Sequence, residues 1–234
     1  MSRTATLVSE LLPLRPQGFL IEYGNPNGGD VDLFAVVNEP VVMSWVLGVI
    51  DMHVLPTEEC CRLVALFDPA VTEPLGSGRF VDGDRVLYEQ MLEASRTAKP
   101  THDAGIHLVR RSRAELARAS AWLGEFVSKP TSRAAQGLFM AMSYSVSYAE
   151  SARRILTDLA RPLSFAELLI RNPLLSEIRS QLTAAKTGAY AGVEAAEDAM
   201  TMVEAAVAGI DLQRSRKAAL SNKDSTCHFH TPRS

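Results

Sequence analysis

The sequence lacks the short motifs that mark the commonest classes of enzyme and metal site. It has no G-x-x-x-x-G-K-[ST] phosphate loop, no G-x-S-x-G nucleophile elbow, no H-E-x-x-H zinc motif and no paired C-x-x-C. It also lacks a long hydrophobic run, since the longest, residues 41–50, is far shorter than the roughly 20 residues of a membrane-spanning helix. These absences argue against those site types and predict that the chain makes no contact with a membrane interior.

Cysteine is scarce, and its placement is a poor basis for disulfides. Two of the three cysteines, Cys60 and Cys61, are adjacent, and neighbouring cysteines rarely bridge without strain. The third, Cys227, lies close to His228 and His230, but no second pair of metal ligands accompanies them, so we expect residues 219–234 to form a flexible tail. The N-terminus has no signal-peptide core. Together these features predict a cytoplasmic protein with reduced thiols.

The composition is that of a globular protein whose charge is unevenly distributed. Of 234 residues, 47% are hydrophobic and 22% charged, and the net charge is −3. Residues 1–95 hold 5 basic and 14 acidic side chains, whereas residues 96–234 hold 19 and 13. An acidic half concentrates divalent cations and a basic half attracts phosphate-bearing ligands. Helical surfaces that simply differ in charge explain the split equally well.

Residues 1–95 alternate between short apolar runs and turn residues. This pattern predicts a helix over 4–12, strands over 18–24, 30–37 and 45–56, and a helix over 57–67 capped by Thr57. Apolar runs on either side of Asp82-Gly83 predict a short hairpin or a strand that follows a loop. We therefore expect an α/β domain over residues 1–95.

Beyond residue 96 the sequence is rich in alanine and has helical spacing. It predicts helices over 112–129, 132–160, 164–170, 174–190 and 192–213, the last with a packing seam from Val193 to Ile210. Trp122 falls on the apolar stripe of its helix, which favours core packing over stacking on a nucleic-acid base. The expected fold is thus α+β, with an N-terminal mixed sheet and flanking helices followed by an all-α bundle over 96–218, which offers a surface for homo-oligomers.

Asp30 and Asp32 stand two residues apart at the start of a predicted strand, so both side chains point to one face. Asp51 interrupts the apolar run "VLGVIDMHVL", where an unpaired charge is costly. Three carboxylates brought together by strand pairing would suit a two-metal Mg²⁺ site. The structural alternative is that Asp30 caps a turn while Asp51 pairs with His53 or an arginine.

The sequence offers one other acidic pair, and the D-x-D itself allows one other interpretation. Asp82 and Asp84 flank Gly83, a composition typical of turns, and no distal glutamate completes a calcium loop. A D-x-D that follows a strand also occurs in nucleotide-sugar glycosyltransferases, but that interpretation leaves Asp51 unexplained.

Three segments, "IEYGN", "GGDVDLFAVV" and "GVIDMHVLP", resemble in order and spacing the DNA-polymerase-β-like nucleotidyltransferase superfamily of small bacterial type. The segment "DPAVTEPLGSGRFVDGDRVLYEQ" is similar to one in which a helix leads to a glycine and a "vLY" strand. The resemblance covers roughly residues 4–93.

This resemblance implies a transferase that moves a nucleoside monophosphate from an NTP, expected to be ATP, to an acceptor hydroxyl and releases pyrophosphate. It assigns the catalytic, metal-binding role to Asp30, Asp32 and Asp51. It places a second set of residues against the triphosphate, namely Gly24, Asn25, Gly28 and Gly29. The acceptor would be a small molecule, an RNA or a protein side chain.

An alternative interpretation is that the chain has the same fold but no catalytic turnover. Asn25 stands where the family has serine, and only four residues, "PNGG", separate Asn25 from Asp30. A catalytically weak or inactive module that binds a nucleotide or a partner would also fit these features. Pyrophosphate release distinguishes the two.

Overall fold

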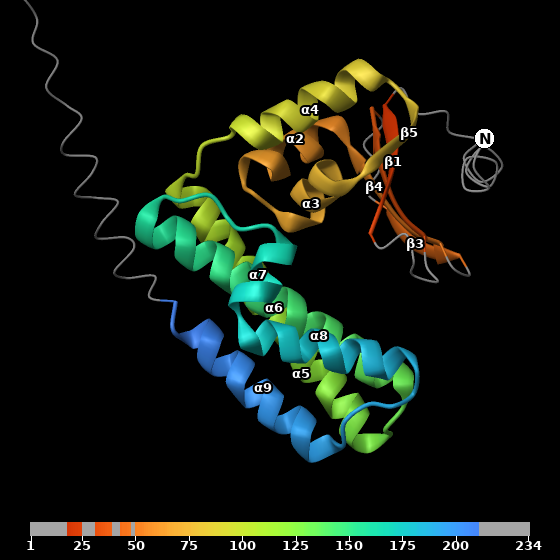
Figure 1. Cartoon of the computed structure of the whole chain (residues 1–234), viewed down its shortest axis with the longest axis vertical. Helices are drawn as coiled ribbons and strands as arrows, with labels where there is room; N and C mark the ends of the chain where they lie inside the picture. The colour runs from red at the N-terminus through yellow and green to blue at the C-terminus, as the bar shows by residue number, and fades with distance from the viewer. Residues whose placement is uncertain (1–17, 25–30, 39–42, 48–49, 211–234) are drawn as a thin grey trace, which may run out of the picture. The chain divides into compact units, whose positions relative to one another are not determined.

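The protein, seen as a computed structural model, is described over residues 18–24, 31–38, 43–47 and 50–210 (Figure 1). It divides into two compact units, residues 1–99 and 100–234. The described part of the first unit contains a mixed sheet and three helices, and that of the second contains helices throughout. The predicted α+β class is confirmed. The expected helix over 4–12 and the expected tail over 219–234 lie outside the described residues.

The first unit is built on a five-stranded sheet in the order β3-β4-β2-β1-β5. The strands are β1 (Phe19–Tyr23), β2 (Val31–Val37), β3 (Met43–Leu47), β4 (Ile50–Pro56) and β5 (Arg79–Gly83). β2 and β4 run parallel, whereas β1–β2, β1–β5 and β3–β4 are antiparallel. After β2 the chain forms the edge strand β3, which runs antiparallel to β2. It then forms β4, which lies between β3 and β2 and runs parallel to β2.

Three helices cover one face of this sheet (Figure 1): α2 (Thr57–Ala65), α3 (Pro69–Ser77) and α4 (Arg85–Thr97). Alternate strand residues such as Phe19, Ile21 and Phe34 pack against them and are fully buried. The intervening residues form a second buried cluster on the opposite face: Leu20, Leu33, Ala35, Val37, Ile50, Met52 and Val54. Both faces of the central strands are therefore buried, which explains why these strands read as continuous apolar runs.

Three local expectations for this unit were wrong. The run 45–56 is two strands, because β3 and β4 are antiparallel and Leu47 pairs with Ile50. The "vLY" segment is the first turn of α4, with Tyr88, Met91 and Ser95 buried at helical spacing and Asp84 capping the helix by accepting from Leu87 N at 3.0 Å. Thr57 does not cap α2, since its Oγ1 lies 3.2 Å from the Val37 carbonyl oxygen.

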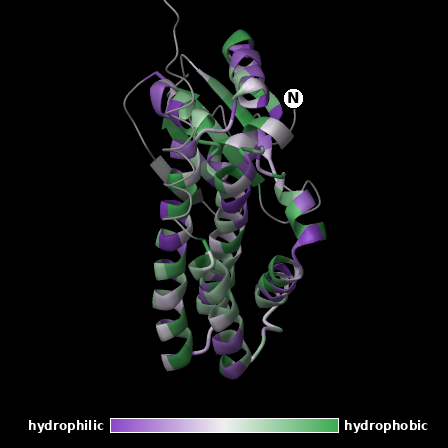
Figure 2. Cartoon of the chain, turned by 90° about the vertical axis from the view of Figure 1, so that its left-hand side faces the viewer, coloured by the Kyte–Doolittle hydropathy of each residue, from purple (hydrophilic) through white to green (hydrophobic). Residues whose placement is uncertain are grey.

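The second unit contains five described helices: α5 (His102–Ser128), α6 (Ser132–Asp158), α7 (Phe165–Arg171), α8 (Pro173–Lys186) and α9 (Val193–Ala208). α5 and α6 each have 27 residues, or about 40 Å of helix. Polar and apolar residues alternate along these helices as they do in amphipathic bundles (Figure 2). The predicted seam of α9 is confirmed, with Ala196, Met200, Val203 and Val207 buried.

Small residues let α5 and α6 approach each other closely. Ser112 and Ser145 are fully buried, and each hydroxyl donates to the other residue's backbone carbonyl at 2.9 Å. The Trp122 ring lies directly against Gly137, where a Cβ atom would overlap it. Trp122 is therefore a packing residue, as its position on the apolar stripe predicted.

In the described part of the chain, no helix combines the length and the apolar character needed to cross a bilayer.

We expect Gly137→Ala to destabilise the helical unit by about 1–2 kcal/mol. Alanine gains roughly 0.5–1 kcal/mol in helix propensity, but its methyl group overlaps the Trp122 ring, and overpacking costs about 1–3 kcal/mol. Gly124→Ala is the matched control, because a Cβ there meets no atom within 4 Å, and it should stabilise by about 0.5–1 kcal/mol. Urea unfolding followed by circular dichroism measures both. Equal stability of the two variants would show that Trp122 does not restrain the approach of the helices.

Candidate active site

Two aspartates face each other across the parallel strands at the centre of the sheet. Asp32 of β2 is the register partner of Asp51 of β4, and Tyr23 of β1 is the partner of Asp32 on the other side. Side chains of directly paired residues share a face. Tyr23, Asp32 and Asp51 therefore form a row across three strands.

This row lies on the face that α2, α3 and α4 cover, at the rim of the core. Phe34 and Val36, which follow Asp32 on the same face of β2, are fully buried, whereas Asp32 is half-buried. The side chain of Asp51 is 43% exposed. Both carboxylates are thus anchored on central strands but remain accessible to solvent.

Gly24 is placed at the edge of this row by β1. Its φ of +89° is strained for residues with a side chain, and a Cβ atom at this position would overlap the Asp32 carboxylate. The sequence resemblance places Gly24 against a triphosphate. The structure places it directly beside Asp32.

His53 follows Asp51 on the same face of β4. Its Nε2 atom lies 4.0 Å from Asp51 Oδ1, and the two side chains are 46% and 43% exposed. This distance exceeds a hydrogen bond, and an exposed pair of this kind contributes little to stability. The alternative in which His53 holds Asp51 as a structural pair therefore gains only weak support.

Four of the predicted site residues lie outside the described residues: Asn25, Gly28, Gly29 and Asp30. Asp30 stands two residues before Asp32, so its expected place on the same face remains a prediction. The described part of the chain contains no group of three histidine, cysteine or acidic side chains that could hold a metal ion. Asp32 and Asp51 supply two carboxylates of the kind that bind metal ions.

The electrostatics of the pair favour a bound cation. Like charges directly opposite each other on neighbouring strands destabilise a sheet by up to about 1 kcal/mol. A hard divalent ion such as Mg²⁺ removes this repulsion and prefers carboxylate oxygens together with water and phosphate oxygens. The oxygen donors and their partial exposure fit such an ion.

Tyr23 is the neighbour that sequence reasoning did not bring to this row. No local pattern marks it, because its position beside Asp32 depends on strand register. A paired register for "IEYG" against "DVDL" would have identified Tyr23 as the partner of Asp32.

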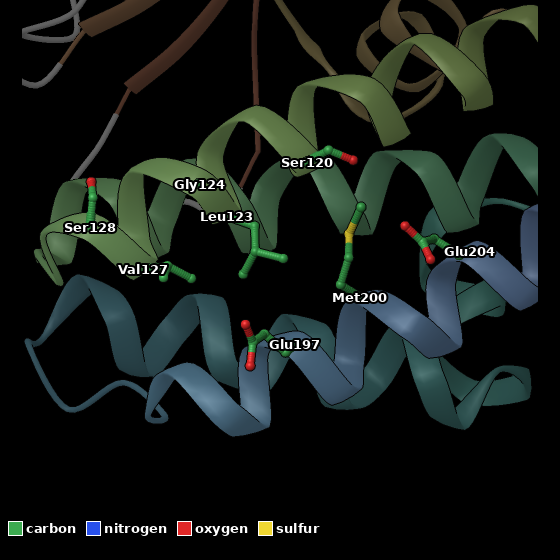
Figure 3. A pocket seen from close by; sticks show the side chains of 8 residues that line it. All are labelled: Ser120, Leu123, Gly124, Val127, Ser128, Glu197, Met200 and Glu204. Atoms are coloured by element: carbon green, nitrogen blue, oxygen red, sulfur yellow. The ribbon is translucent and has the colours of Figure 1, made fainter.

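The helical unit has a groove of about 470 Å³ between α5 and α9 (Figure 3). Leu123 and Val127 of α5 and Met200 of α9 supply apolar surface, and Glu197 and Glu204 project from α9. The two glutamates stand seven residues apart, about 10 Å along the helix, which is too far for both to bind one metal ion. The groove has no histidine, cysteine or basic side chain in its lining and does not constitute a catalytic site.

Cys60 is excluded as a nucleophile by its surroundings. It is fully buried, with its Sγ atom 3.4 Å from Met91 Sδ. Burial, with smaller contributions from Cys61 and Glu59, raises the pKa of the Cys60 thiol to about 12. Because the thiolate is the reactive form, Cys60 is inert near neutral pH.

Alkylation distinguishes the two adjacent cysteines. Cys61 is exposed, so we expect iodoacetamide to modify it in the native protein at pH 8 while Cys60 stays unmodified. Urea should make both reactive, because unfolding lowers the pKa of Cys60 to its ordinary value. Peptide mass mapping measures the two sites separately. Equal native labelling would contradict the burial of Cys60.

No protein-family model matches the chain, and no curated protein matches it. Among solved structures it is similar to a nucleotidyltransferase-like protein from Exiguobacterium sibiricum, with 12% sequence identity and a TM-score of 0.40, over 96% of this chain and 80% of that one. The description of that protein agrees with the resemblance in the sequence. A likeness this distant carries no functional argument, so the function must be argued from the carboxylates.

Proposed function

We propose that the first unit is a metal-dependent nucleotidyltransferase that moves a nucleoside monophosphate from an NTP to an acceptor hydroxyl and releases pyrophosphate. The observation that carries the proposal is the in-register pairing of Asp32 with Asp51 on parallel strands. Two partly exposed carboxylates paired on neighbouring strands repel each other, and a bound cation would remove that repulsion, which supports a functional role for the pair.

In this proposal Asp32 and Asp51, together with Asp30, hold Mg²⁺. The bound ions would neutralise charge on the triphosphate and its leaving group. Asp51 is the outermost carboxylate of the row and the most suitable to accept the proton of the acceptor hydroxyl. Gly24 leaves the Asp32 carboxylate accessible, since a side chain at that position would occupy the same space.

The proposed nucleotide is ATP, and the acceptor is a small molecule, an RNA or a protein hydroxyl. We also propose a cytoplasmic location, because Cys60 and Cys61 are both free thiols.

A second candidate is a nucleotide-binding module without turnover. It is favoured by Asn25 in place of the family serine and by the four residues between Asn25 and Asp30. Both functions predict binding of Mg²⁺·NTP, and only the first predicts release of pyrophosphate.

We expect Asp32→Asn to abolish the stabilisation that Mg²⁺·ATP confers on the parent protein. The substitution keeps the size of the side chain and removes one negative charge, so apo stability should rise by up to about 1 kcal/mol while cation binding is lost. In the parent protein, ligand at 100 times its Kd should stabilise by about 2.7 kcal/mol. Thermal melts with and without Mg²⁺·ATP measure both effects.

Asp82→Asn is the matched control for this experiment. Asp82 is exposed, and its carboxylate accepts a hydrogen bond from Gly83 N at 2.8 Å, a role that asparagine preserves. This variant should respond to Mg²⁺·ATP as the parent does. An unchanged ligand response in Asp32→Asn would remove Asp32 from the metal site.

Turnover is measured as pyrophosphate release with a panel of NTPs and with small-molecule, RNA and protein acceptors. Asp32→Asn and Asp51→Asn should each reduce the rate by several orders of magnitude, whereas Asp82→Asn should not. A parent protein that binds Mg²⁺·NTP but releases no pyrophosphate with any acceptor supports the binding module instead.

A further inference from the structure

The helical unit contains a second pocket, of about 280 Å³, beside the C-terminal end of α6 and the junction of α7 with α8. Three arginines contribute to its lining: Arg153 and Arg154 from the last turns of α6, and Arg171 from the end of α7. The three guanidinium groups give one small cavity a concentration of positive charge, although the chain as a whole has a net charge of −3. The pocket belongs entirely to the second unit and is independent of the carboxylate row.

The local fold explains why these arginines converge. α6 ends at Leu159, whose left-handed conformation (φ 48°, ψ 30°) turns the chain back. Arg154 Nε donates to the Arg161 carbonyl oxygen at 2.7 Å, which fixes its guanidinium beside the returning segment. A capping box between Ser164 and Glu167 then starts α7, which ends at Arg171.

The charged side chains that line the pocket differ in whether they are already paired. Arg153 is already paired with Glu150, with its Nη2 atom 2.6 Å from Glu150 Oε2. Among the described residues, the Arg154 side chain donates through Nε to Arg161, and no bond of its Nη atoms is seen. The Arg171 side chain makes no hydrogen bond or ion pair with any residue the structure describes, although its charge acts on the Glu167 carboxylate. Asp158 is the second carboxylate of the lining.

Glu167 lies close by but is engaged elsewhere. Its Oε2 accepts from both Ser164 N, at 2.9 Å, and Ser164 Oγ, at 2.8 Å. These hydrogen bonds lower the pKa of the Glu167 carboxyl, and Arg171 and Arg154 lower it further. The carboxylate is therefore ionised and capping α7, while the lining itself keeps three positive and two negative groups.

We propose that this pocket binds the phosphate group of a small phosphorylated molecule. Planar guanidinium groups donate paired hydrogen bonds to phosphate oxygens, and a dianion is attracted more strongly than a carboxylate. Asn172 retains its amide donors, since its oxygen caps α8 by accepting from Leu175 N at 3.0 Å. Leu168, which is buried, offers apolar contact to an organic substituent. The volume suits a small ligand rather than a polyanion.

Binding of inorganic phosphate and of glycerol 3-phosphate to the full chain, measured by isothermal titration calorimetry at constant ionic strength, tests this proposal. Arg171→Gln should weaken binding by about tenfold or more, because it removes charged donors. Asp158→Asn should strengthen binding severalfold, because it removes the lining carboxylate that repels the anion. Circular dichroism checks that each variant keeps its helices.

Arg133→Gln is the matched control. Arg133 lies at the start of α6, the helix that carries Arg153 and Arg154, and it is exposed and not part of the lining. This variant therefore changes net charge as much as Arg171→Gln does and should bind as the parent does. If Arg171→Gln and Arg133→Gln weaken binding equally, the effect is one of net charge and the pocket proposal is wrong.

The ligands themselves distinguish the remaining outcomes. Tighter binding of glycerol 3-phosphate than of phosphate supports a phosphomonoester site, and equal binding supports recognition of the phosphate group alone. No binding of either at about 10 mM overturns the proposal. Arg171-dependent binding of a short RNA without binding of either small phosphate also overturns it, in favour of a polyanion surface.

Discussion

The parallel, in-register pairing of β2 with β4 is the constraint on which the first unit depends. It buries Leu33, Ala35, Met52 and Val54 on one face of the sheet. The same register sets Asp32 beside Asp51 on the other face. A slip of one residue would turn every β4 side chain to the opposite face, so Met52 would leave the core and Asp51 would enter it. The packing that stabilises the sheet therefore also holds the two carboxylates together.

The repulsion between Asp32 and Asp51 destabilises the sheet locally, and the packing around these two residues offsets it. Directly paired like charges oppose folding, and Gly24 adopts a backbone conformation that few other residues tolerate. Beneath the row, Phe34, Val36 and the three covering helices form a fully apolar core. Charged residues that destabilise the packing around them are expected at functional sites. Here these residues, Asp32 and Asp51, lie only at the rim of the core.

The helical unit is organised by close contact between its two long helices. The reciprocal hydrogen bonds of Ser112 and Ser145 satisfy buried hydroxyls, and Gly137 admits the Trp122 ring. α6 is buried along most of its length. Two of its three arginines, Arg153 and Arg154, lie in its C-terminal turns, where they line the same pocket as Arg171 of α7.

The sequence by itself determined the elements that have a strong periodic signal. Short apolar runs bounded by turn residues identified β1 and β2, the spacing of Ala196 to Val207 identified the seam of α9, and the charge inside an apolar run marked Asp51. Tertiary structure decided the features that depend on contacts between residues far apart in the sequence. β3 and β4 are antiparallel strands that follow each other within one continuous apolar run, which gives no sign of the division. The segment "RVLYEQ" fits both a strand and a helix, and the packing of Tyr88 and Met91 against the sheet decides for the helix. The register that joins Asp32 to Asp51, and the turn that brings Arg171 to Arg154, involve residues 17 to 19 positions apart, and only packing determines which distant side chains become neighbours.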